Sequence, residues 1–243
     1  MSRPFEVGWT GDLPAGPAAV WDAVTRRTAG WLWPVEYESR AGGSERGLGG
    51  GTVTVWEPPS RFTTRSGEGS GGGNELDYRL EPRGSGTHLR YTHRGTADGD
   101  YDREVDACRR HTNFYYHSLV EYVRHFAGRD AVYVTADGPE ASARGGSDLL
   151  RRALGVSGDV AVGDRVRLTP AGLPPIDGVV DYATPEFLGV RTSDALYRWY
   201  GRDAWGWPVG LAHHLFGPDV DGVAAGAAWN RWLTGIFASE EVA

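Results

Sequence analysis

The side chains best suited to acid–base chemistry in this sequence are a few histidines, of which His93 has the clearest placement. His93 alternates with Leu89 and Tyr91 along an expected strand, so the three side chains share one face and point inward together. A general base needs an orienting carboxylate and a substrate proton within reach, and the sequence identifies neither. We therefore expect His93 to have a structural role or to form a hydrogen bond to a ligand.

A second set of candidates lies on one long expected helix. Cys108, the single cysteine of the chain, stands three residues before His111, a spacing that permits contact on a helix. Nothing in the sequence supplies an oxyanion hole for a thiol nucleophile, so a structural role for Cys108 is favoured. His111 and His117 fall on different faces of the helix, so they do not form a chelating pair.

The acidic cluster of Asp98, Asp100 and Asp102 imitates the first half of a calcium loop. An EF-hand would need glycine and glutamate at the positions where this chain has Arg103 and Arg109. The three carboxylates fit a helix N-terminus better, because they complement the positive end of the helix dipole there. The sequence therefore predicts no metal site, no cofactor and no catalytic residue.

Composition excludes several classes of protein. The chain has 243 residues, with 25 Lys plus Arg against 32 Asp plus Glu and a net charge of −7. No lysine occurs, which excludes Schiff-base enzymes and the lysine of a P-loop, and the net negative charge argues against nucleic-acid binding. No apolar run approaches the roughly 20 residues of a membrane span, and the N-terminus lacks the hydrophobic stretch of a signal peptide. We therefore expect a cytoplasmic protein that binds neither nucleic acid nor membrane.

The elements that must position these side chains follow from periodicity. Residues 5–11 alternate as a strand does, and residues 18–25 have the apolar spacing of a short helix that begins at Pro17. Period-two patterns then predict antiparallel strands at 52–56, 61–65, 76–80 and 89–93, with a Gly/Ser hairpin tip at 67–73. Apolar and aromatic residues at three- and four-residue spacing predict a long helix from Val105 to Phe126.

The second half repeats this order in shortened form. It shows a strand at 131–134, a helix at 147–154, strands at 165–168, 178–182, 187–191, 196–200 and 209–216, and a last helix over 223–237. With Gly178 placed under Gly51, the hairpin that follows each glycine has the same plan. We predict two units, residues 1–128 and 129–243; the alternative is one large domain whose last third is unrelated to the first.

Several motifs of the first half resemble the START-like (SRPBCC) superfamily, and within it the branch of the heat-shock-protein-90 ATPase activator. They are Val20 to Thr25, Gly51 to Phe62 with its Glu57-Pro58-Pro59-Ser60 turn, Leu89 to His93 and the long helix. The resemblance covers residues 5–127. It implies an α+β helix-grip fold, in which a curved antiparallel sheet wraps around a long C-terminal helix and encloses a cavity. The second half looks like a diverged and shortened copy, which makes a tandem of two such units.

If the sheet faces the aromatic side of the long helix, the enclosure is mostly apolar with a few polar tips, as in small-molecule pockets. The candidate ligand-binding residues are Trp33, Leu76, Tyr78, Tyr91, His93, His111, Tyr115, Leu119 and Tyr122. The same side chains fit a filled core, since aromatic stripes are often packing. Both interpretations stay open at the level of sequence.

The function we predict is non-catalytic binding of a small hydrophobic or aromatic molecule, by a monomer or homodimer. One alternative is a co-chaperone-like role with a protein partner, an activator of a heat-shock ATPase. The loops with Trp31, Trp33, Trp205 and Trp207 would then be the contact surface if exposed, and plugs if buried. A second alternative is a polyketide cyclase-like enzyme, in which His93 and Tyr91 polarise a carbonyl group.

Overall fold

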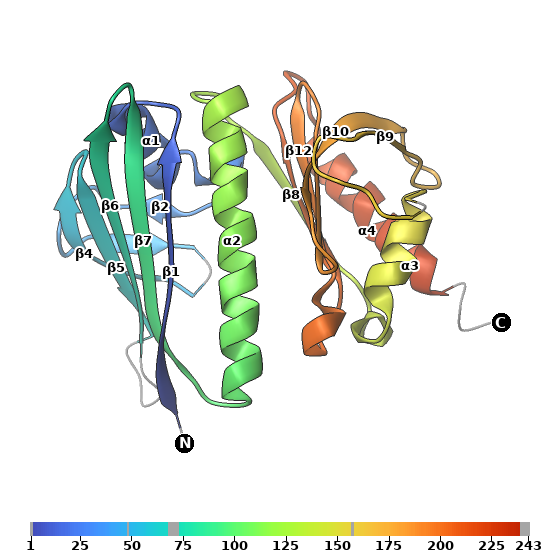
Figure 1. Cartoon of the computed structure of the whole chain (residues 1–243), viewed down its shortest axis with the longest axis horizontal. Coiled ribbons are helices and arrows are strands. Elements are labelled where there is room, and N and C mark those ends of the chain that lie inside the picture. The colour runs from blue at the N-terminus through green and yellow to red at the C-terminus, as the bar shows by residue number, and fades with distance from the viewer. Residues whose placement is uncertain (1, 48, 68–72, 157, 239–243) are drawn as a thin grey trace. The chain divides into compact units, whose positions relative to one another are not determined.

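Two antiparallel sheets, each followed by a C-terminal helix, make up most of the computed structural model of the chain (Figure 1). The structure describes residues 2–47, 49–67, 73–156 and 158–238, so most of the expected hairpin tip at 67–73 lies outside the described residues. The chain divides into two units, Met1–Asp130 and Ala131–Ala243. No helix of the described residues is long and apolar enough to cross a membrane.

The first unit is a seven-stranded sheet that carries one short and one long helix. Its elements are β1 (Arg3–Leu13), α1 (Pro17–Thr25), the 3-10 turn η1 (Thr28–Gly30), β2 (Glu36–Tyr37), β3 (Ser44–Arg46), β4 (Gly51–Glu57), β5 (Arg61–Ser66), β6 (Asn74–Arg83), β7 (Gly86–Ala97) and α2 (Tyr101–His125). The strand order is β1-β7-β6-β5-β4-β3-β2, so the last strand returns to lie beside the first. The α+β helix-grip arrangement predicted from the sequence is confirmed.

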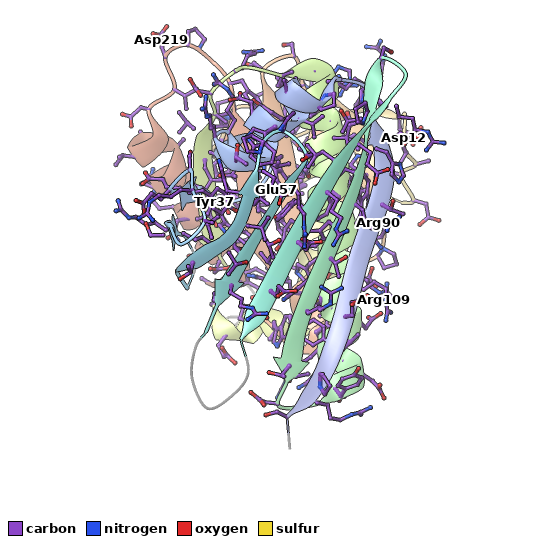
Figure 2. The ribbon with its side chains drawn as sticks, turned by 90° about the vertical axis from the view of Figure 1, so that its left-hand side faces the viewer. Asp12, Tyr37, Glu57, Arg90, Arg109 and Asp219 are labelled. Carbon is purple, nitrogen blue, oxygen red and sulfur yellow. The ribbon has the colours of Figure 1, made fainter. Side chains whose placement is uncertain are left out.

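Alternation along the strands decides which face is buried. On β7, Leu89 and Tyr91 are buried, whereas Arg90 between them is exposed, as the period of two requires. Figure 2 looks onto the polar face of this sheet, where Asp12, Glu57 and Arg90 lie in open view. The inner face therefore supplies the apolar surface on which α2 packs.

Helix α2 begins where the acidic cluster predicted a helix N-terminus. The Asp100 carboxylate is the N-cap and accepts a hydrogen bond from the backbone N–H of Arg103 at 3.2 Å. Asp102 and Glu104 occupy the first turn and Arg124 the last, so charges at both ends complement the helix dipole. The helix packs mainly against β1 and β7 and against α1, so it covers one side of the inner sheet face.

The second unit follows the same path with fewer strands. Its elements are β8 (Val132–Asp137), η2 (Glu140–Ala143), α3 (Gly146–Ala153), β9 (Arg165–Leu168), β10 (Ile176–Ala183), β11 (Phe187–Arg191), β12 (Ala195–Tyr200), η3 (Arg202–Trp205), β13 (Gly210–Leu215) and α4 (Gly222–Ala238). The order β8-β13-β12-β11-β10-β9 again brings the last strand back beside the first. The two sheets thus fit a tandem of related units.

An irregularity of strand pairing recurs at matching places in the two sheets. The β4–β5 register shifts between Val53 and Val55, and the β10–β11 register shifts between Val180 and Tyr182. When Gly178 is placed under Gly51, Val180 falls under Val53 and Tyr182 under Val55, so the two bulges coincide. Bulges bend the strand that carries them, and related proteins keep them at the same position. The coincidence supports the alignment of the two halves.

Aromatic rings are closely packed on the inner face of the second sheet. Trp199, Trp229 and Trp232 are 1%, 6% and 6% exposed and belong to one apolar core with strand and helix residues. His213 lies among them, with its ring centroid 4.5 Å from that of Trp229 and 5.1 Å from that of Trp199. Its Nδ1 accepts a hydrogen bond from the backbone N–H of Arg198 at 3.1 Å. Burial, with smaller effects of neighbouring groups, lowers the pKa of His213 well below its ordinary value.

This buried imidazole predicts acid instability of the second unit. The unfolded chain protonates His213 below pH of about 6.5, whereas the folded unit does not, so stability is full above that pH and is lost as the pH falls further. The loss from this group is about 1.4 kcal/mol per pH unit below that point. His213→Gln keeps an acceptor for the Arg198 N–H and removes the titration. Urea unfolding at pH 7.5 and 5.5 should show a smaller pH effect in the variant, and equal pH effects in both proteins would contradict the prediction.

Candidate functional site

A cavity of about 240 Å³ lies in the first unit, between the inner face of the sheet and the N-terminal half of α2. It forms over β5 and β6 because α2 packs mainly against β1 and β7 and leaves that part of the sheet uncovered. Its walls come from β2, β3, β5, β6, β7, α2 and the segment after η1. They consist of Trp31, Leu32, Trp33, Val35, Tyr37, Glu45, Ser66, Asn74, Leu76, Tyr78, Tyr91, His93, Cys108, His111, Thr112, Tyr115 and Tyr116.

The structure brings seven of the nine predicted ligand-binding residues to this cavity. They are Trp33, Leu76, Tyr78, Tyr91, His93, His111 and Tyr115. Leu119 and Tyr122 are not among the lining residues, and both are fully buried in the packed half of α2. The Tyr122 ring lies directly against Gly30, where an added Cβ would come within 2.5 Å of it, and its hydroxyl donates to the Arg129 carbonyl at 3.0 Å. Close packing against η1 therefore closes the space that the sequence pattern left open at these two positions.

Tyr116 marks the border between the packed half and the open half of α2. Its ring stacks on Trp9 of β1 at 5.0 Å between centroids and lies 4.6 Å from Tyr91 and 5.6 Å from Trp31. Its hydroxyl is hydrogen-bonded to that of Tyr78. Tyr116 is not among the predicted ligand-binding residues, although it follows Thr112 by four residues and precedes Leu119 by three. A wider apolar face, as is usual for helices that pack on a sheet, would have included it.

The four tryptophans expected to be either plugs or exposed surface divide between the two. Trp31 is 1% exposed, and its indole N–H donates to the Ala23 carbonyl at 3.0 Å, so it is a plug at the inner end of the cavity. Trp33 is half-buried and meets Tyr115 edge to face at 5.4 Å, which places this pair where the cavity reaches solvent. In the second unit Trp205 is 4% exposed and Trp207 is 38% exposed.

A carboxylate and a buried hydroxyl of the cavity wall are available to a bound molecule. The Oε2 atom of Glu45 is buried and unpaired, although the side chain lies beside the hydroxyls of Tyr37 and Tyr78. Tyr91 is 7% exposed and contributes its hydroxyl to the same cavity wall. Burial, followed by the neighbouring Tyr78 and Cys108, raises the pKa of Tyr91 well above its ordinary value, so this hydroxyl keeps its proton. An acceptor and a donor therefore face the same apolar space.

His93 is held between two side chains at the cavity wall. Its Nε2 lies 2.8 Å from Oδ1 of Asn74, and its Nδ1 lies 3.4 Å from the Sγ atom of Cys108. Phe5 packs edge-on against the imidazole at 5.1 Å. Burial lowers the pKa of His93 and raises that of Cys108, so both are neutral near pH 7. The sequence analysis considered Cys108 with His111, whose Nδ1 instead contacts the Ala107 carbonyl at 2.8 Å.

No group of three or more His, Cys, Asp or Glu side chains that could hold a metal ion occurs in residues 2–47, 49–67, 73–156 and 158–238. Asp98, Asp100 and Asp102 do not form such a group. Asp100 serves as the helix cap described above.

Comparison with known proteins matches the first unit to one family. Residues 14–124 match the family described as Activator of Hsp90 ATPase homolog 1-like protein. No curated protein matches the chain.

Among solved structures, CalU16 from Micromonospora echinospora is 20% identical, with 51% of this chain and 86% of that chain covered and a TM-score of 0.41. The Aha1 dimer from Colwellia psychrerythraea is 18% identical, with 49% and 96% covered and a TM-score of 0.41. DynU16, described as a protein in the dynemicin biosynthetic locus, is 17% identical, with 98% of both chains covered and a TM-score of 0.43.

The border at Tyr116 predicts different costs for truncating the two halves of α2. Leu119→Ala opens a hole in a packed core and should lower the free energy of unfolding by about 2–5 kcal/mol. Tyr115→Ala widens the existing cavity and loses ring contacts such as those to Trp33 and His111, so we expect a cost of roughly 1 kcal/mol. Urea denaturation of the two variants measures both values, and equal costs would show that the cavity does not end at Tyr116.

Proposed function

We propose that the first unit, of which residues 14–124 match the family of Activator of Hsp90 ATPase homolog 1-like proteins, binds a small hydrophobic or aromatic molecule in its helix-grip cavity. The observation that carries the proposal is the 240 Å³ space lined by aromatic rings with a few polar groups at fixed places. Ligand pockets of proteins have this composition, and those for drug-sized molecules begin at about 300 Å³. A molecule of one or two rings therefore suits the size of this cavity.

The polar groups of the wall define what such a molecule should carry. A buried carboxylate oxygen without a partner costs free energy, and a hydrogen-bond donor from a ligand removes that cost. Glu45 supplies the acceptor, and Tyr91 supplies a hydroxyl that can donate to a ligand oxygen. A planar molecule with a hydroxyl at one edge and a carbonyl or ether oxygen at another satisfies both groups.

We assign binding to the first unit alone. In the second unit, Trp199, Trp229 and Trp232 occupy the space between the sheet and α4. We propose that residues 131–243 are a diverged tandem copy in which these rings have replaced the cavity. The matching strand path and the coinciding bulges support this relationship.

The co-chaperone-like alternative loses part of the surface on which it was based. Trp31 and Trp205 are 1% and 4% exposed, so neither can contact a protein partner without local unfolding. The cyclase-like alternative keeps one specific observation in its favour, because Tyr91 and His93 line the same cavity. It requires turnover of a bound carbonyl compound, whereas binding alone does not.

Filling the cavity should abolish ligand binding without unfolding the protein. We expect 2-naphthol to quench tryptophan fluorescence saturably and to stabilise the parent protein by about 2.7 kcal/mol at one hundred times its Kd. Leu76→Trp places an indole in the cavity and should remove both effects. Glu81→Trp, on the exposed face of the same strand, is the matched control and should bind like the parent. Unchanged binding by Leu76→Trp would place the ligand elsewhere.

Glu45 should determine the preference for ligands with a hydroxyl group. We expect the parent protein to bind 2-naphthol about tenfold more tightly than naphthalene, since one hydrogen bond to a charged acceptor is worth about 1.5 kcal/mol or more. Glu45→Leu keeps an apolar wall and removes the acceptor, so the two affinities should become nearly equal. Titration calorimetry of the four pairs measures the change. A preference that survives in Glu45→Leu would show that another group binds the hydroxyl.

A further inference from the structure

We propose that Cys108, His93 and Asn74 form a triad that adds the Cys108 thiol to an α,β-unsaturated carbonyl compound held in the cavity. The triad lies in the wall of the same cavity, so the inference rests on the proposed binding function and goes beyond it. It assigns a covalent chemistry to a site that the sequence analysis treated as non-catalytic.

The geometry of the triad fixes the roles of the two imidazole nitrogens. The Asn74 Oδ1 atom accepts a hydrogen bond at 2.8 Å, so Nε2 of His93 carries the hydrogen. Nδ1 therefore presents its lone pair to the thiol of Cys108 at 3.4 Å. Gly95 leaves room for the amide, because a Cβ there would lie 2.6 Å from Asn74 Oδ1. Nucleophile, base and orienting amide stand in the order that activates a cysteine in Cys-His-Asn sites.

A second observation, independent of the triad, points to the ligand. Tyr91 is 7% exposed and lines the same cavity, and burial, the largest effect, raises the pKa of its hydroxyl, so that it stays protonated. Tyr91 and Cys108 both line this cavity, so the hydroxyl and the thiol face the same bound molecule. A buried donor that faces an open space is aimed at an acceptor that a ligand brings. In conjugate addition, that acceptor is the carbonyl oxygen on which negative charge develops.

The step balances within the site. The Cys108 sulfur forms a bond to the β-carbon of the enone while the thiol proton moves to Nδ1 of His93. The electron pair of the C=C π bond moves toward the carbonyl oxygen and gives an enolate, whose oxygen accepts a hydrogen bond from Tyr91. The enolate α-carbon then takes the proton from His93. The product is a thioether, the C=C bond has become a single bond, and no oxidant, reductant or water is consumed.

Electrostatics restrict this reactivity to molecules inside the cavity. Burial holds the pKa of Cys108 above and that of His93 below its ordinary value, so the resting pair is thiol and neutral imidazole. The groups that face His93 are Asn74 from β6, Cys108 from α2 and Phe5 from β1, and no charged side chain perturbs its pKa in the described chain. Without a standing thiolate, the sulfur reacts only when a bound electrophile takes its electrons while His93 takes the proton.

The test uses the intact chain and benzylideneacetone, a small aromatic enone, with the adduct followed by intact-protein mass spectrometry. Because the chain has one cysteine, a single adduct that disappears in Cys108→Ala is assigned without ambiguity. The rate should saturate with enone concentration. It should fall about 10²-fold or more in His93→Gln and Tyr91→Phe and by a smaller factor in Asn74→Ala. His88→Gln, on the same strand but paired with Asp12 at the surface, is the matched control and should react like the parent.

A pH profile separates proton transfer from a merely structural role of His93. In the parent, the rate should be flat around neutral pH and fall as the pH drops below the lowered pKa of His93. In His93→Gln, only thiolate reacts, so the rate should rise tenfold per pH unit through the same range. A parent profile that also rises tenfold per unit would overturn the role of His93.

Binding of benzylacetone, the saturated analogue, distinguishes failure of the inference from failure of the proposed function. If benzylacetone binds the parent but benzylideneacetone reacts no faster than with free N-acetylcysteine, the triad is inert and binding stands. If neither compound binds, both the proposed function and the triad chemistry are wrong. Saturable binding together with a rate that depends on His93 supports both.

Discussion

The packing of Tyr116 against Trp9 and Tyr91 is the contact on which the rest of the first unit depends. It holds α2 over β1 and β7, and the Tyr116 ring fills the space between the helix and these strands. On the C-terminal side of this contact, Leu119 and Tyr122 are close-packed against the sheet and η1. On its N-terminal side the helix is held away from β5 and β6, and the cavity is the space that remains. The cavity thus arises from ordinary core packing that stops half-way along a helix.

The second unit combines a similar strand order with a core rich in aromatic rings. Its strands follow the same path, and the bulge between Val180 and Tyr182 coincides with the bulge between Val53 and Val55. Three indole rings fill the space against α4, and His213 is enclosed among them. Under the proposed relationship between the units, larger side chains have taken the place of the cavity, and they enclose an imidazole that must stay neutral.

The polar groups of the cavity make the proposed binding compatible with the proposed chemistry. Glu45 and Tyr91 offer an acceptor and a donor to a bound molecule, which is what orientation requires. Cys108 and His93 are kept neutral by burial, so the site can hold a ligand without a permanently reactive thiolate. Reaction then depends on the chemistry of the ligand, and a saturated molecule would bind and leave unchanged.

The sequence by itself determined the elements, because strand and helix periods are local: the apolar spacing of α2, the alternation of Leu89, Tyr91 and His93, and the acidic start at Asp100 are all where the pattern predicted. It also indicated the family and seven of the side chains that line the cavity. Only the tertiary structure decided where the cavity ends, since Tyr115 and Tyr122 have the same helical phase and differ in what lies opposite them. It alone brought Asn74, His93 and Cys108 together, because they come from three elements whose distances depend on strand pairing and on the height of the helix above the sheet.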